Sequence, residues 1–259
     1  MKQLSVIFSF ILICFSCNTK PKEIIKTTYK EVATETKKTI KNPPLSITKD
    51  FVLGKFDYKS DSSFVKVSTV HSTKEVHLNN EVYNAFLLMA DSALKSGIKL
   101  KIISGTRNFY EQKVIWERKW EKFSNLKPIE RAKKILEYSS MPSSSRHHWG
   151  TDVDLNSLNN SYFNSGKGLE TYNWLIAHAN TFGFYQVYTD KENNRTGYNL
   201  EKWHWSYLPL ASQYLEFYNT NIDIKDIKGF DGSKLAEKIN IIEDYVNGIS
   251  KKAKKYKLK

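Results

Sequence analysis

Apolar residues recur with a helical period over residues 81–96, which predicts the first long helix of the chain. Val82, Phe86 and Ala93 fall on one face of such a helix. Gly97 follows directly, and glycine readily adopts the left-handed conformation that ends a helix. The pattern therefore predicts an amphipathic helix that stops at Gly97.

The period changes to two directly after this helix. The alternation over residues 98–103 predicts a half-buried strand. Arg107 lies just past the end of that strand, where a rigid element can hold a binding residue. Residues 110–123 return to a helical period and predict a second helix.

Short strand patterns and one more helix follow in the second half of the chain. We expect strands at 152–155, 184–188 and 201–207, and a helix at 169–182 that ends at Gly183. A polar loop joins the last two strands, which are expected to form an antiparallel hairpin. These elements predict an α+β fold in which helices surround a small antiparallel sheet.

The C-terminal part, residues 219–259, is expected to form a helix and a basic tail. Ser233 is a suitable N-cap. The apolar face of the helix would carry Leu235, Ile239, Ile242, Val246 and Ile249. We expect this helix to pack on the domain; binding to a partner or a membrane surface is the alternative.

The first residues are typical of a targeting sequence. Lys2 precedes an apolar run over residues 4–15, which is too short to span a bilayer. The stretch before Cys17 is similar to a loose bacterial lipobox, so residues 1–17 are expected to be a lipoprotein signal peptide with lipidation of Cys17. An ordinary secretory signal or a signal anchor is the alternative.

Residues 18–50 are rich in Lys, Thr, Glu and Pro and predict a flexible linker, because such a segment buries too little apolar area to fold. It would tether the domain to a membrane. The only two cysteines are Cys14 and Cys17. The domain that starts near residue 51 therefore has no disulfide and no thiolate metal ligand.

The net charge of +13 is concentrated at the two ends of the chain, where lysines cluster in residues 20–41 and 251–259. Blocks of this kind are usually solvated and bind anionic surfaces without specificity. No nucleic-acid-binding motif is present in the sequence, so we expect no nucleic-acid partner. We expect a monomer.

Histidines and carboxylates gather in two stretches, residues 145–154 and 201–205. Their order, with imidazole, carboxylate and a second imidazole, fits a catalytic zinc site, which needs three ligands, an open position and a nearby base. Asp152 and Asp154 alternate along a predicted strand and share a face, so one can bind a metal while the other orients a ligand.

Glu201 and His204 are three residues apart on a predicted strand, which nominally places them on opposite faces. A bulge or a strand end is needed to bring both side chains to one metal ion. His148 is a second open question, because it adjoins His147 and could replace it as a ligand. Alternation favours His147 and turns His148 away.

Two blocks of the chain share a known pattern, Ser-x-His-x-x-Gly-x-x-x-Asp at 145–154 and Glu-x-Trp-His at 201–204. This pattern resembles the zinc D-alanyl-D-alanine carboxypeptidases of the VanY type, which are related to D-Ala-D-Ala dipeptidases and the amino-terminal domain of Hedgehog proteins. Residues 104–112 look like the upstream arginine segment of that family. The resemblance covers residues 51–218 and implies a zinc site on the sheet.

The resemblance implies that zinc is bound by His147, Asp154 and His204, with Glu201 as the catalytic base. Many relatives carry a small residue where this chain has Asp152, so Asp152 could rival Asp154 as a ligand. The family spacing favours Asp154.

Three further residues receive roles from the resemblance. Arg107 would anchor the substrate carboxylate or the developing oxyanion, and a structural salt bridge is its alternative role. Ser145 and Gln112 would contact the substrate.

The expected function is a zinc-dependent D-alanyl-D-alanine carboxypeptidase that removes a C-terminal D-Ala from peptidoglycan stem peptides. The expected location is the bacterial cell envelope, with a lipid anchor facing the periplasm or the cell surface. The alternatives are an L,D-carboxypeptidase or a peptidoglycan endopeptidase of the same fold, and a non-catalytic wall-binding lipoprotein.

Overall fold

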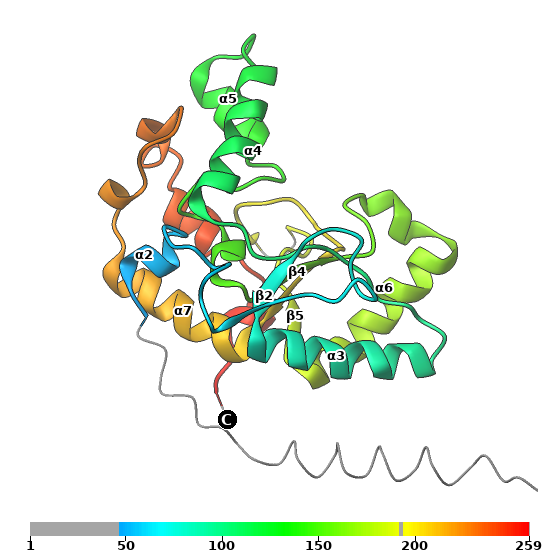
Figure 1. The fold of residues 1–259 in the computed structure, drawn as a ribbon. Coiled ribbons are helices and arrows are strands. Elements are labelled where there is room, and N and C mark those ends of the chain that lie inside the picture. Colours follow the sequence, from blue (N-terminus) through cyan, green and yellow to red (C-terminus); the bar gives the residue numbers. More distant parts are fainter. Residues whose placement is uncertain (1–46, 192–193, 259) are drawn as a thin grey trace, which may run out of the picture. The chain divides into compact units, whose positions relative to one another are not determined.

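Four short antiparallel strands form the sheet at the centre of the computed structural model, which describes residues 47–191 and 194–258 (Figure 1). In spatial order they are β3 (Ile102–Ser104), β4 (Asp152–Leu155), β6 (His204–Tyr207) and β5 (Phe184–Gln186). A second sheet pairs β1 (Phe64–Lys66) with β2 (His77–Asn79). The expected α+β fold is confirmed.

Helices surround this sheet. In Figure 1, α4 and α5 project upward and α3 runs beneath the strands. In chain order the helices are α2 (Lys49–Val52), α3 (Asn80–Lys95), α4 (Phe109–Lys122), α5 (Pro128–Ile135), α6 (Gly166–His178), α7 (Leu208–Asn221) and α8 (Lys251–Lys254).

Alternation along the two central strands gives the sheet an apolar face and a polar face. Val153 of β4 and Trp205 of β6 join the main hydrophobic core, together with the buried face of α3. Asp154 on β4 and His204 on β6 are the adjacent residues along each strand, and their side chains face the opposite way. These two residues are directly paired in the register. The core therefore anchors the strands that carry the polar residues.

The first two predicted helices are confirmed to within one residue at each end. The helix expected at 81–96 is α3, with Asn79 as its N-cap. The helix expected at 110–123 is α4, which begins with a capping box between Asn108 and Glu111. The strand at 152–155 and the β5–β6 hairpin are also confirmed.

The strand expected at 98–103 is shorter and later than predicted, because only residues 102–104 join the ladder. Asn156 has a left-handed backbone with φ of 61°. Its side chain accepts from the N–H of Lys101 and donates to the carbonyl of Lys99. The Asn156 side chain thus takes up the backbone hydrogen bonds of Lys99 and Lys101 that would otherwise pair with a neighbouring strand.

The helix expected at 169–182 is confirmed with shifted ends. It starts at Gly166 and gives way after His178 to a 3-10 turn, Ala179–Phe182. Gly183 follows with the left-handed φ of 83° that the sequence predicted for a helix stop.

The single C-terminal helix expected from Ser233 is wrong. The segment forms a 3-10 turn at Ser233–Leu235 and a π-helix at Ile241–Val246. Asn240 separates them with a left-handed φ of 53°, which interrupts a helix. The expected packing on the domain is nevertheless observed, because Ile239, Val246 and Ile249 are buried.

The end of this segment lies along the edge of the sheet. Ser250 donates from its backbone N–H to the carbonyl of Val187 at 2.8 Å. Its hydroxyl donates to the carbonyl of Gln186 at 3.0 Å. Helix α8 follows directly and packs against β5.

Both expected domain boundaries fall inside helices, since residue 50 lies in α2 and residue 218 in α7. The expected signal peptide (1–17), the lipidation of Cys17 and residues 18–46 of the expected linker lie outside the described residues. Within the described part of the chain, no helix combines the length and apolar character needed to cross a membrane.

Candidate active site

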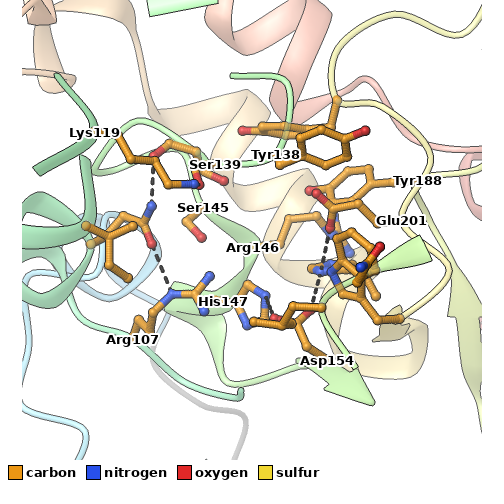
Figure 2. A pocket seen from close by; sticks show the side chains of 18 of the residues that line it. Arg107, Lys119, Tyr138, Ser139, Ser145, Arg146, His147, Asp154, Tyr188 and Glu201 are labelled. Atoms are coloured by element: carbon orange, nitrogen blue, oxygen red, sulfur yellow. Dashed lines mark hydrogen bonds and ion pairs between the residues drawn. The ribbon is translucent and has the colours of Figure 1, made fainter. Parts of the chain in front are cut away.

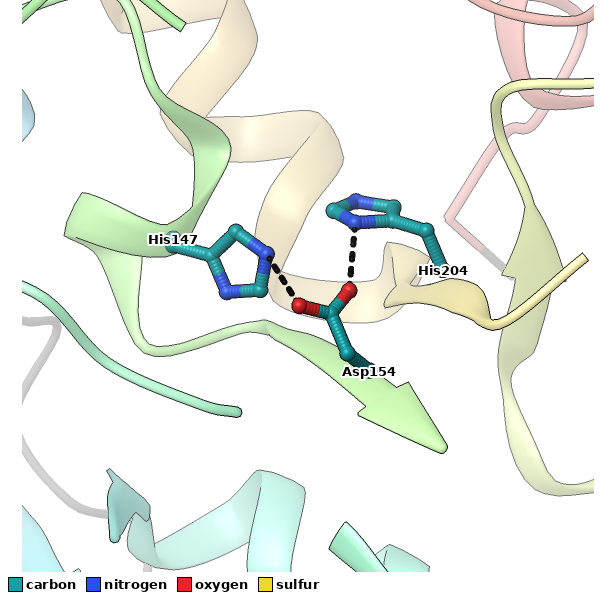
Figure 3. Close-up of side chains that lie close together, drawn as sticks. All are labelled: His147, Asp154 and His204. Atoms are coloured by element: carbon teal, nitrogen blue, oxygen red, sulfur yellow. Dashed lines mark hydrogen bonds and ion pairs between the residues drawn. The ribbon is translucent and has the colours of Figure 1, made fainter. Parts of the chain in front are cut away.

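Three side chains from separate elements converge on the polar face of the sheet (Figure 3). His147 comes from a 3-10 turn (Arg146–Trp149), Asp154 from β4 and His204 from β6. The carboxylate of Asp154 lies 3.4 Å from Nε2 of His147 and 3.0 Å from Nδ1 of His204. One ligand atom from each residue lies within 4.8 Å of the others, and all three residues are buried.

A glycine turn allows His147 and Asp154 to meet. Gly150 ends the 3-10 turn with a left-handed φ of 69°, and a Cβ at this position would lie 2.3 Å from the ring of Phe64. Only glycine combines that backbone conformation with that close approach. The turn redirects the chain from His147 into β4.

Hydrogen bonds on the far side of each imidazole fix which nitrogen faces the cluster. Nδ1 of His147 lies 2.8 Å from the carbonyl of Gly105, which can only accept. Nε2 of His204 lies 2.8 Å from the carboxylate of Asp152. The other nitrogen of each ring is therefore left to bind a metal.

The residues present fit a zinc ion by their chemistry. Two imidazole nitrogens and one carboxylate oxygen form a donor set that catalytic zinc sites use, and three protein ligands leave a position for water or substrate. The structure thus brings together the three predicted ligands.

Asp152 occupies the opposite side of the His204 ring from Asp154. Its Oδ2 accepts from Nε of Arg146 at 3.1 Å as well as from His204. Its Oδ1 accepts from the hydroxyls of Thr151 and Ser206 at 2.7 and 2.8 Å. With both oxygens satisfied and fully buried, Asp152 orients His204, and Asp154 faces the ligand cluster.

Burial by itself would raise the pKa of Asp152. The guanidinium of Arg146 and the hydrogen bond from His204 outweigh burial, so the pKa lies below its usual range. The carboxylate therefore stays ionised beside His204.

His148 is turned away from the cluster, and both of its ring nitrogens are used elsewhere. Nδ1 donates to the carbonyl of Arg107 at 2.7 Å, and Nε2 accepts from the backbone N–H of Ser143 at 3.1 Å. Burial lowers the pKa of His148 to about 3. The ring is therefore a neutral structural element that ties two loops together.

Glu201 lies in the turn that precedes β6, so the strand end that the sequence required is present. The backbone N–H of His204 donates to the Glu201 carbonyl at 3.3 Å. The Glu201 carboxylate lies 3.7 Å from Nδ1 of His204 and is buried. Burial is the main reason that its pKa is raised, to about 8, and a carboxyl group of this kind can exchange protons near neutrality.

Arg107 is held in place by neighbouring side chains (Figure 2). Its Nε donates to Oε1 of Gln112 at 3.0 Å, and its Nη1 donates to the hydroxyl of Ser104. Gln112 in turn donates from Nε2 to the carbonyl of Ser140 at 2.8 Å. Gln112 therefore positions Arg107, and its substrate contact stays a prediction.

These residues line one pocket of about 590 Å³. Ser145 lies in its wall, and its buried hydroxyl has no hydrogen-bond partner among the described residues. The pocket also includes residues that sequence reasoning missed. They are Ile115, Arg118, Lys119, Tyr138, Ser139, Ser140, Arg146, Leu158, Asn159, Asn160, Tyr188, Tyr198 and Trp203.

The missed residues carry only weak sequence signals. Lys119 is one of several charges on an amphipathic helix, and Tyr188 ends a short apolar stretch. The pairing of α4 with the loop at 138–140 could have been found only from the fold.

Residues 75–210 match a family model described as VanY: D-alanyl-D-alanine carboxypeptidase. The chain is also 29% identical over 146 residues to YodJ of Bacillus subtilis (strain 168), which carries a provisional carboxypeptidase name. That alignment covers 56% of this chain and 51% of YodJ, so the chain spans about half the length of the curated relative.

Two solved structures are similar in fold at 21% identity each and a TM-score of 0.48. One is VanYB in complex with D-alanine-D-alanine, and the match covers 64% of this chain and 93% of that chain. The other is the LdcB LD-carboxypeptidase, whose structure is described as revealing the molecular basis of peptidoglycan recognition; here the match covers 74% of this chain and 81% of that chain.

Proposed function

Because the chain belongs to the VanY family of D-alanyl-D-alanine carboxypeptidases, we propose that it removes a C-terminal D-alanine from peptidoglycan stem peptides with the help of zinc. The observation that carries this proposal is the cluster of His147, Asp154 and His204 beside the buried carboxyl of Glu201. The similarity to YodJ supports the same class of reaction.

Zinc would be held by His147, Asp154 and His204. When bound, it supplies a Lewis acid that polarises the scissile carbonyl and makes a water molecule more acidic. Asp152 and the carbonyl of Gly105 fix the ring orientations of the two histidines, so the chain presents its donor atoms already aligned.

Glu201 would move the proton. Its buried carboxylate accepts a proton from the water that attacks the carbonyl of the penultimate residue. The protonated carboxyl then donates to the nitrogen of the leaving D-alanine, which departs as a free amino acid. Burial raises the pKa of Glu201, and a more basic carboxylate accepts the proton of the attacking water more readily.

Arg107 would bind the terminal carboxylate that an exopeptidase must recognise, or the oxyanion that forms during attack. A guanidinium is planar and permanently charged, so it can bind a carboxylate through two parallel hydrogen bonds. Gln112 and Ser104 occupy two of its nitrogens and would orient the remaining donors toward the substrate. Ser145, whose hydroxyl has no hydrogen-bond partner in the described part of the chain, would be a further substrate contact.

The direct experiment is mass spectrometry of stem peptides after incubation with the full chain, with and without zinc. One peptide ends in D-Ala-D-Ala and the other ends in a single D-Ala. Zinc-dependent loss of one alanine from the first supports the proposal, and loss from the second would make the enzyme an L,D-carboxypeptidase. Cleavage at an internal bond would identify an endopeptidase.

We also propose that the enzyme acts in the cell envelope, attached through a lipidated Cys17. A family that acts on cell-wall peptides works outside the cytoplasm, and the apolar run before Cys17 fits a lipoprotein signal. Fractionation of cells that express wild type or Cys17→Ala tests the anchor. The wild type should stay with membranes, and the variant should be released from them.

A further inference from the structure

The pocket contains more cationic side chains than the proposed reaction uses. Its lining includes two carboxylates, Asp154 and Glu201, and four cationic residues. Arg146 is paired with Asp152, and Arg107 serves the substrate carboxylate or the oxyanion in the proposed function. The other two cations are Arg118 and Lys119 of α4.

Among the described residues, Lys119 forms no ion pair with a carboxylate. Its ammonium donates instead to the hydroxyl of Ser139. The residue is half-buried and faces the pocket, whereas Arg118 is exposed. A half-buried ammonium with one neutral partner retains donors that can bind an anion.

Lys119 and Arg107 are held by hydrogen bonds to neighbouring parts of the same pocket wall. Gln112 accepts from Arg107 and donates to the carbonyl of Ser140, and the adjacent Ser139 accepts from Lys119. Figure 2 shows Lys119, Ser139 and Arg107 on the same side of the pocket, with Glu201 and Tyr188 on the other. The two cations are therefore positioned together.

The electrostatic environment of Lys119 favours an anion. Burial is the largest effect that lowers its pKa, and the guanidinium of Arg118 lowers it further. Glu201 acts in the opposite direction, while Arg107 and Lys122 add to the positive field. A carboxylate bound beside Lys119 would offset both the burial and the repulsion.

A separate observation also points to a ligand at this wall. The hydroxyl of Ser145 lines the same pocket, and it is buried without a hydrogen-bond partner among the described residues. A buried hydroxyl without a partner costs free energy that a bound ligand can recover.

We infer that Lys119, held by Ser139 and linked to Arg107 through Gln112, is a carboxylate-binding position for the substrate peptide. This inference rests on the proposed function for the identity of the ligand as a peptide. The carboxylate at Lys119 comes either from a side chain on the amino-terminal side of the scissile bond or from the peptide terminus. In the second case, Arg107 is left to the oxyanion.

The test is a comparison of kcat/KM for the full chain on two peptides ending in D-Ala-D-Ala. One has Glu at the third position from its C-terminus and the other has Gln. Lys119→Met removes the ammonium but keeps an apolar stem. Lys122→Met is the matched control, because Lys122 is exposed on the same helix and lies outside the pocket lining.

We expect the wild type and Lys122→Met to favour the Glu peptide roughly tenfold, and Lys119→Met to lose that preference. If Lys119→Met instead lowers kcat/KM for both peptides about equally, the bound group is the terminal carboxylate. If both variants match the wild type on both peptides, the inference is overturned.

Failure of the proposed function would be visible separately. In that case the wild type cleaves neither peptide, and calorimetric titration of the same peptides into the wild type, Lys119→Met and Lys122→Met measures binding alone. Weaker binding only in Lys119→Met supports the carboxylate position, and equal binding overturns it. Thermal unfolding of each variant shows whether a loss arises from misfolding.

Discussion

Asp152 and His204 are joined by a hydrogen bond of 2.8 Å on the side of the imidazole opposite Asp154. Asp152 thus contacts a proposed ligand, His204, on the side of the ring that faces away from the proposed metal site. Arg146 shares the same oxygen of Asp152 and balances its charge in the buried interior.

We predict that Asp152→Asn lowers zinc affinity by about 10- to 100-fold, because His204 loses the anionic acceptor that fixes its ring. Competition with a chromophoric chelator measures the affinity directly. Asp91→Asn is the control, since Asp91 is an exposed residue of α3 paired with Lys95. Equal zinc affinity in the wild type and Asp152→Asn would refute the orienting role.

We predict that Glu201→Gln lowers kcat by about 10²- to 10⁴-fold, because the amide cannot accept the proton of the attacking water. Zinc content should stay at the wild-type level, as Glu201 is outside the ligand cluster. Glu130→Gln, an exposed change on α5, should leave kcat unaltered. A Glu201→Gln enzyme with normal kcat would exclude Glu201 as the base.

We predict that Gln112→Ala raises KM by roughly tenfold, because Arg107 loses its acceptor and presents its guanidinium less accurately. If Arg107 binds the terminal carboxylate, kcat should change little. A fall in kcat at constant KM would indicate that Arg107 acts on the oxyanion. Gln213→Ala, exposed on α7, provides the comparison.

We predict that His148 makes folding stability depend on pH. Its pKa is about 3 in the folded protein and about 6.5 when unfolded. Below pH 6.5, His148 is therefore protonated in the unfolded chain but stays neutral in the folded chain. The stabilisation is complete above pH 6.5 and is lost as the pH falls.

The measurement is urea unfolding of the wild type and His148→Gln at pH 7 and pH 5. The wild type should lose about 2 kcal/mol of unfolding free energy relative to the variant over this range. An unchanged difference between the two proteins would show that His148 is not held neutral.

Much of the site could be predicted because its chemistry is local in sequence. The alternation of Asp152, Val153 and Asp154 fixes which side chains share a face, and the turn at Gly150 is encoded by the glycine itself. The strand end between Glu201 and His204 followed from the need to bring both to one point. Spaced motifs of this kind can predict site residues without knowledge of how the chain packs.

Other features depend on contacts between distant segments. The family spacing favours Asp154 over Asp152, but the hydrogen bond between Asp152 and His204 joins two separate strands and is visible only in the fold. Lys119 lines the pocket and donates to Ser139, which lies 20 residues later in the chain. The predicted C-terminal helix is wrong because Asn240 takes a left-handed conformation, which cannot be predicted from the spacing of apolar residues.

The hydrogen bonds from Ser250 to Val187 and Gln186 cover the outer edge of the four-stranded sheet. β5 is the outermost strand of the sheet, and an uncovered outer strand can recruit a strand from another molecule. The last residues of the chain shield it. A chain truncated before Ser250 would therefore be expected to self-associate through the exposed edge of β5.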